Sequence, residues 1–62
     1  MDEKRQLIRE AVDVLVDTSG LDIVEGAIFR RLATRAVENC WREGISLQAL
    51  VAAARKELGI KA

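Results

Sequence analysis

The chain has 62 residues, half of them hydrophobic and about a third charged, and its formal net charge is zero. This balance is typical of a folded globular domain and excludes a disordered tail. A chain this short forms one domain, residues 1–62, whose core rarely supplies more than about 3–5 kcal/mol. With one cysteine and no histidine it has neither an internal disulfide nor the common zinc spacings. Oligomerisation is therefore the expected source of further stability.

The sequence predicts a cytoplasmic protein without a membrane partner. No apolar run approaches the roughly 18–20 residues that span a bilayer, and no signal-type apolar block follows the charged residues 2–5. The lone Cys40 agrees with a reducing compartment.

The charge is unevenly distributed. Residues 1–22 carry three basic and six acidic side chains, a net charge of −3, whereas residues 23–62 carry seven basic and four acidic side chains, a net charge of +3. Such charges can neutralise each other within one chain or between two subunits.

The first predicted element is a helix over residues 3–18, with Asp2 as its N-cap and Gly20 near its C-terminal end. Its apolar residues follow helical spacing. They are Leu7, Ile8, Ala11, Val12 and Leu15. Valines 12, 14 and 16 would also suit a short strand, but no second alternating segment is present to pair with it.

The second and longest predicted element is a helix over residues 23–43, because Asp22 followed by Glu25 resembles a capping box. One side of this helix is apolar and includes Ile28, Phe29, Leu32, Ala33, Ala36, Val37 and Cys40. Four apolar residues at its two ends project toward the opposite, charged side and need additional cover. They are Ile23, Val24, Ala27 and Trp41. Gly26 with Ala27 makes a notch that a second helix could approach; the alternative is a helix that starts only at Ala27.

The third predicted element is a helix from the N-cap Ser46 to Leu58, ended by Gly59. Only Gly44 and Ile45 separate it from the second helix, so the two are expected to pack antiparallel or to turn sharply. The predicted fold class is all-α, a three-helix domain of medium, long and short helices. Its predicted core is Ile8, Val12, Leu15, Ile28, Leu32, Ala36, Leu47, Leu50, Val51 and Leu58.

Four arginines gather on the charged side of the second helix: Arg30, Arg31, Arg35 and Arg42. Guanidinium groups suit bidentate contact with phosphates or carboxylates, so this basic face could bind nucleic acid or an acidic protein. Alternatively, Glu10 and Asp13 of the first helix pair with Arg30 and Arg31, and Glu38 pairs with Arg42 one turn later. We favour an arginine face that is solvated or internally paired.

Glu10, Asp13 and Asp17 form an acidic stripe near the end of the first helix, where the helix dipole disfavours negative charge. A bound cation would compensate, but three carboxylates on one helix match no calcium geometry, and the Glu-x-x-His of carboxylate-bridged iron sites is missing. The sequence therefore predicts pairing with arginines and no metal site.

Cys40 has no histidine to activate it and is interpreted as a core residue. Trp41 is either a plug at the edge of the core or an interface anchor. No nucleophile with a base, phosphate-binding glycine loop or metal-ligand spacing is present. We therefore predict no catalytic residues, no cofactor and no enzymatic activity.

The predicted order of a shorter, a long and a shorter helix is faintly similar to small prokaryotic histones, through residues 36–44 (AVENCWREG) and residues 53–58 (AARKEL). The chain lacks that family's Arg-Lys-Thr element and its basic charge, and its connection after the second helix is shorter. The similarity is one of topology and implies no function.

These features together predict a non-enzymatic module that acts by protein–protein association. Its expected form is a homodimer with the second helix at the interface, where Ile23, Val24, Ala27 and Trp41 become buried. Association with another protein is the other form considered, and a small nucleic-acid-binding dimer that uses the arginine face is the alternative function.

Overall fold

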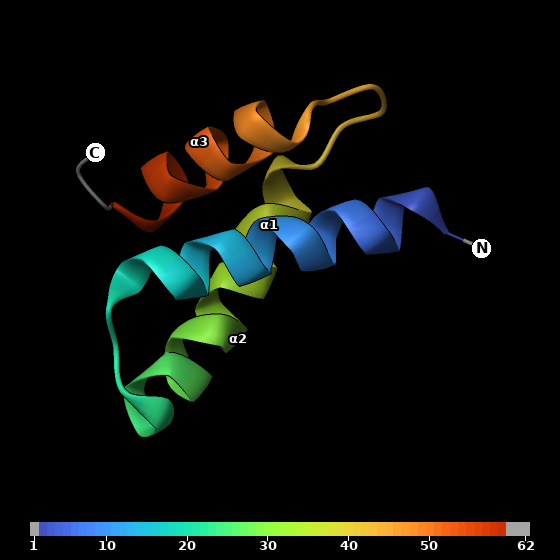
Figure 1. Ribbon diagram of the computed structural model, residues 1–62. Coiled ribbons are helices and arrows are strands. Elements are labelled where there is room, and N and C mark those ends of the chain that lie inside the picture. Colours follow the sequence, from blue (N-terminus) through green and yellow to red (C-terminus); the bar gives the residue numbers. More distant parts are fainter. Residues whose placement is uncertain (1, 60–62) are drawn as a thin grey trace.

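The computed structural model describes residues 2–59 and contains three α-helices, each in contact with the other two (Figure 1). They are α1 (Glu3–Ser19), α2 (Ile23–Cys40) and α3 (Leu47–Leu58). No strand occurs between residues 2 and 59, so the all-α class is confirmed and the valine cluster is helical. None of the three described helices is both long and apolar enough to cross a bilayer.

Helix α1 begins and ends within one residue of the predicted positions. Asp2 occupies the N-cap, although its side chain accepts no capping hydrogen bond, and Gly20 ends the helix with a φ of 70°. This left-handed conformation carries a penalty for residues that have a Cβ. The hydroxyls of Thr18 and Ser19 donate back to the carbonyls of Val14 and Val16 in the last turns. The chain then turns into α2 within three residues.

The N-terminal ends of α2 and α3 are capped as predicted. The Asp22 carboxylate accepts a hydrogen bond of 2.8 Å from the Glu25 amide, and the Ser46 hydroxyl accepts one of 3.2 Å from the Ala49 amide. Each bond satisfies a donor that the first helical turn leaves free. Gly59 ends α3 with a φ of 78°.

The predicted C-terminal end of α2 was wrong. The helix ends at Cys40 because Trp41 has an extended backbone (φ −64°, ψ 137°), and the Trp41 side chain packs against the core. Gly44 is not a helix cap but lies in a turn in which the Ile45 amide donates to the Arg42 carbonyl. The α2–α3 connection therefore spans residues 41–46, and α2, with 18 residues, is hardly longer than α1, with 17.

The three helices share one core of ten buried side chains, most of them small. They are Ile8, Ala11, Val12, Leu15, Ala33, Ala36, Val37, Leu50, Val51 and Ala54. Leu47 and Leu58, also predicted in the core, are partly buried against it. Alanines on the inner face of α2 let the axes of neighbouring helices approach closely, because interaxial distance depends on the side chains at the contact.

The prediction that Ile28 and Leu32 lie in the core was wrong. These side chains are 61% and 54% exposed. Apolar residues extend around more than one face of α2, and α1 and α3 pack on the face that carries Ala33, Ala36 and Val37. The larger side chains at positions 28 and 32 are left on the outside.

Gly26 is buried within the first turns of α2, yet a Cβ added there meets no atom within 4 Å. We therefore expect Gly26→Ala to raise the free energy of unfolding by roughly 0.5–1 kcal/mol, because alanine favours the helix and fits without a clash. Urea denaturation followed by circular dichroism measures the change. Gly20→Ala is the matched control and should lower the stability; stabilisation by Gly20→Ala would contradict the argument from φ.

Candidate interaction surface on α2

Among residues 2–59, the most exposed apolar surface lies on the outside of α2. Val24, Ile28 and Leu32 follow one another at intervals of four residues and are 70%, 61% and 54% exposed. Residues four apart lie on the same face of a helix, so these three side chains form one stripe, which we call the outer stripe. Ile23, at 91% exposure, Ala27 and Leu21 extend it at its N-terminal end.

The arrangement of the helices explains why the outer stripe stays uncovered. α1 and α3 both pack on the inner face of α2, where Ala33 and Val37 are fully buried. In Figure 1 the first turns of α2, which carry Ile23 and Val24, project beyond α1 and away from α3. The chain between residues 2 and 59 has no further element that could cover this side.

The four arginines of the predicted basic face do not share one surface. Arg31 and Arg35 are exposed and lie on the outer face of α2, next to the outer stripe. Arg42 follows the end of the helix and is exposed in the 41–46 connection. Arg30 turns toward α1, so two arginines, rather than four, accompany the outer stripe.

Arg30 forms an ion pair with Asp13 across the α1–α2 contact, with 2.5 Å between Nη2 and the carboxylate oxygen. This pairing of an α1 carboxylate with an α2 arginine was predicted. Both side chains are nearly half exposed, so the pair contributes only about 0.2–1 kcal/mol. It is the one ion pair within 4 Å among residues 2–59, and the predicted Glu38–Arg42 pair does not form there.

The rest of the acidic stripe remains on the surface of α1. Glu10 and Asp17 are exposed, and no group of three carboxylate or cysteine side chains in the described residues is placed to hold a metal ion.

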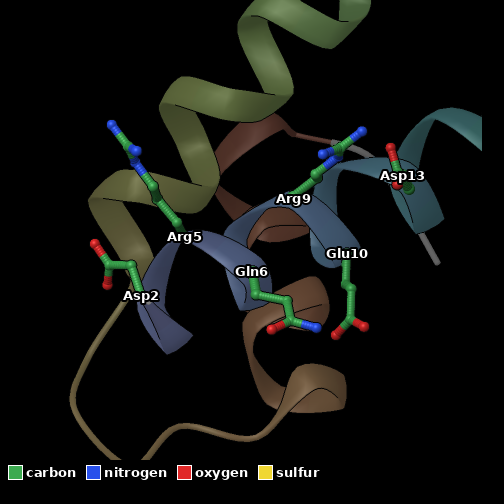
Figure 2. A pocket seen from close by; sticks show the side chains of 6 residues that line it. All are labelled: Asp2, Arg5, Gln6, Arg9, Glu10 and Asp13. Atoms are coloured by element: carbon green, nitrogen blue, oxygen red, sulfur yellow. The ribbon is translucent and has the colours of Figure 1, made fainter.

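A polar hollow lies along the same helix, α1 (Figure 2). Its lining is Asp2, Arg5, Gln6, Arg9, Glu10 and Asp13, and almost all of these side chains are exposed. These side chains all project from one face of α1 and its N-cap, so they do not converge on an enclosed site.

Cys40 and Trp41 both pack against the core from the end of α2. The Lys4 ammonium lies 4.7 Å from the centre of the Trp41 ring, a cation–π contact between α1 and the 41–46 connection. The Trp41 indole nitrogen is buried and finds no acceptor among the described atoms. Of the two roles considered for Trp41, the structure shows the packing of a residue at the edge of the core.

The sequence pattern contained a signal for the outer stripe that the prediction missed. Ile28 and Leu32 were assigned to the core, whereas Ile23, Val24 and Ala27 were predicted to need additional cover. Val24, Ile28 and Leu32 are four residues apart, so they form a second apolar row beside the one that contains Ala33 and Val37. Two apolar rows on one helix predict two packing partners.

Comparison of the chain with protein-family models, with curated proteins and with solved structures finds no match.

The Asp13–Arg30 pair is exposed, so its coupling is expected to be small. Double-mutant cycles with Asp13→Ala and Arg30→Ala should give a coupling free energy below about 1 kcal/mol that shrinks as salt is added. Urea denaturation at low and high salt measures it. A coupling of several kcal/mol, unaffected by salt, would show that this pair and not the apolar core joins α1 to α2.

Proposed function

We propose that the protein is a non-enzymatic module that acts by protein–protein association through the outer face of α2, and that its form is a homodimer. The observation that carries this proposal is the outer stripe itself. Scattered exposed apolar residues are normal on protein surfaces, whereas a contiguous apolar patch marks an interaction site. The proposal includes a cytoplasmic location, in keeping with the unpaired Cys40.

Three of the four residues predicted to lie at an interface belong to this surface. Ile23, Val24 and Ala27 are exposed on the chain and would be covered on association. Trp41 already packs against the core and lies outside the proposed surface. Ile28 and Leu32 take its place, because their exposure continues the surface along the helix.

The energy available from this surface suits a concentration-dependent dimer. Complete burial of an aliphatic side chain contributes about 1.5–3 kcal/mol, so the partly exposed residues of two copies together contribute on the order of 10 kcal/mol. Association costs an estimated 4–15 kcal/mol in lost freedom of motion. A small core supplies only about 3–5 kcal/mol of stability, so association between folded chains would stabilise the fold further.

Nucleic-acid binding, the alternative function, would use Arg31 and Arg35. In that case binding to DNA or RNA falls steeply with salt and weakens when both arginines become alanine. In the proposed function the same double substitution weakens association between chains instead. The apolar residues of the outer stripe beside these arginines favour a protein partner, because the phosphate backbone offers no apolar counterpart to them.

Ile28→Glu tests the proposal. The substitution leaves the core untouched because Ile28 is exposed in the single chain, but it places two unpaired charges inside the proposed dimer contact. We expect the dissociation constant, measured by sedimentation equilibrium, to rise at least about a hundredfold.

The control is Gln48→Glu, which adds the same charge at an exposed position of α3 and should leave the dissociation constant unchanged. Circular dichroism shows whether both variants keep their helices. A wild-type chain that stays monomeric at high micromolar concentration would contradict the proposed dimer.

A further inference from the structure

We propose that two copies of the chain pair through α2 helices that run in the same direction and cross at Ile28, with Glu25 of each copy facing Arg31 of the other. The inference rests on the proposed function and specifies how the outer stripe is covered. It is carried by exposed charges of opposite sign on the two sides of the stripe.

Glu25 and Arg31 flank the centre of the outer stripe from opposite sides. A helix turns by about 100° per residue, so Glu25, three residues before Ile28, lies about 60° to one side of it, and Arg31, three residues after it, lies about 60° to the other. Arg35 is on the same side as Arg31, one turn further on. All three side chains are exposed, and none makes an ion pair within residues 2–59 of its own chain. The stripe therefore has an acidic edge and a basic edge.

A two-fold axis along the outer stripe relates two copies whose α2 helices run in the same direction. This rotation lays the stripe on the same stripe of the second copy and exchanges the two edges, so Glu25 of each copy faces Arg31 of the other. Rows of residues four apart are inclined by about 26° to the helix axis, so aligned rows set the two axes about 50° apart, the commonest class of helix packing. A second copy thus supplies the counterpart of both edges at once.

Two helices that run in opposite directions would bring like charges together. Their two-fold axis crosses the stripe, so the rotation reverses the order of residues along the stripe but keeps each edge on its own side. Glu25 then faces Glu25 and Arg31 faces Arg31, and like charges that face each other in a contact are unfavourable. The apolar residues fit both orientations, whereas the charges favour helices that run in the same direction.

Charge reversal tests the arrangement. In homodimers of Glu25→Arg or of Arg31→Glu, both contacts between positions 25 and 31 become repulsive, and each variant alone should dimerise about tenfold more weakly than the wild type. An equimolar mixture of the two variants restores both contacts, so its heterodimer should return to wild-type affinity. A mere loss of helix stability would not be repaired by mixing. The double variant Glu25→Arg/Arg31→Glu should also regain wild-type affinity, as a homodimer. Sedimentation equilibrium at low salt measures all four.

Cysteine cross-linking tests the orientation independently of charge. When the helices run in the same direction, Val24 lies beside Val24 of the second copy and Leu32 beside Leu32, whereas the opposite orientation sets Val24 beside Leu32. Under mild oxidation, Val24→Cys alone and Leu32→Cys alone should each give disulfide-linked dimers, and a mixture of the two should give few mixed dimers. The wild-type chain, in which the partly buried Cys40 is the only cysteine, is the control.

Lys56→Glu and Glu57→Arg are matched controls for the charge reversals, since they change the net charge by the same amounts at exposed positions of α3. Neither control, nor their mixture, should alter the dissociation constant. A wild-type dimer that the reversals at positions 25 and 31 do not weaken, or a mixture in which disulfides between positions 24 and 32 predominate, overturns the arrangement and leaves the proposed function standing. A monomeric wild type overturns both.

Discussion

The small side chains on the inner face of α2 are the constraint on which the rest of the structure depends. Ala33 and Ala36 are buried where α1 and α3 pack, and with Val37 they let both helices approach the same side of α2. Because α1 and α3 pack on one face of α2, the part of the chain that the structure describes supplies no neighbour for the opposite face. The larger residues Ile28 and Leu32 lie on that opposite face, so the exposed surface follows from the way the core is built.

The ends of the helices could be predicted from sequence because capping is local. Asp22 and Ser46 act on amides three residues away, and Gly20 adopts the left-handed conformation itself, so no distant part of the chain is needed to set them. The end of α2 could not be predicted in this way. Trp41 leaves the helix and packs against the core, a tertiary contact that overrides the helical pattern through residue 43.

The candidate surface was predicted only in part, for a related reason. Periodicity shows that α2 has apolar residues on more than one side but does not show which row faces α1 and α3. Ile28 and Leu32 were assigned to the core because helical spacing places them on the same apolar side as Ala33 and Ala36, whereas of these four only the alanines are buried. The unequal charge of the two halves was a correct guide to the Asp13–Arg30 pair, the one ion pair among residues 2–59.

The central claim is that the outer stripe of α2 is covered by the same stripe of a second copy. Nuclear Overhauser effects between methyl groups in a sample that mixes isotope-labelled and unlabelled chains test this claim most directly, because only contacts between different copies are recorded. The account predicts intermolecular signals among the methyl groups of Val24, Ile28 and Leu32. Intermolecular signals from residues of α1 or α3 instead, or none at concentrations where the chain is dimeric, would contradict it.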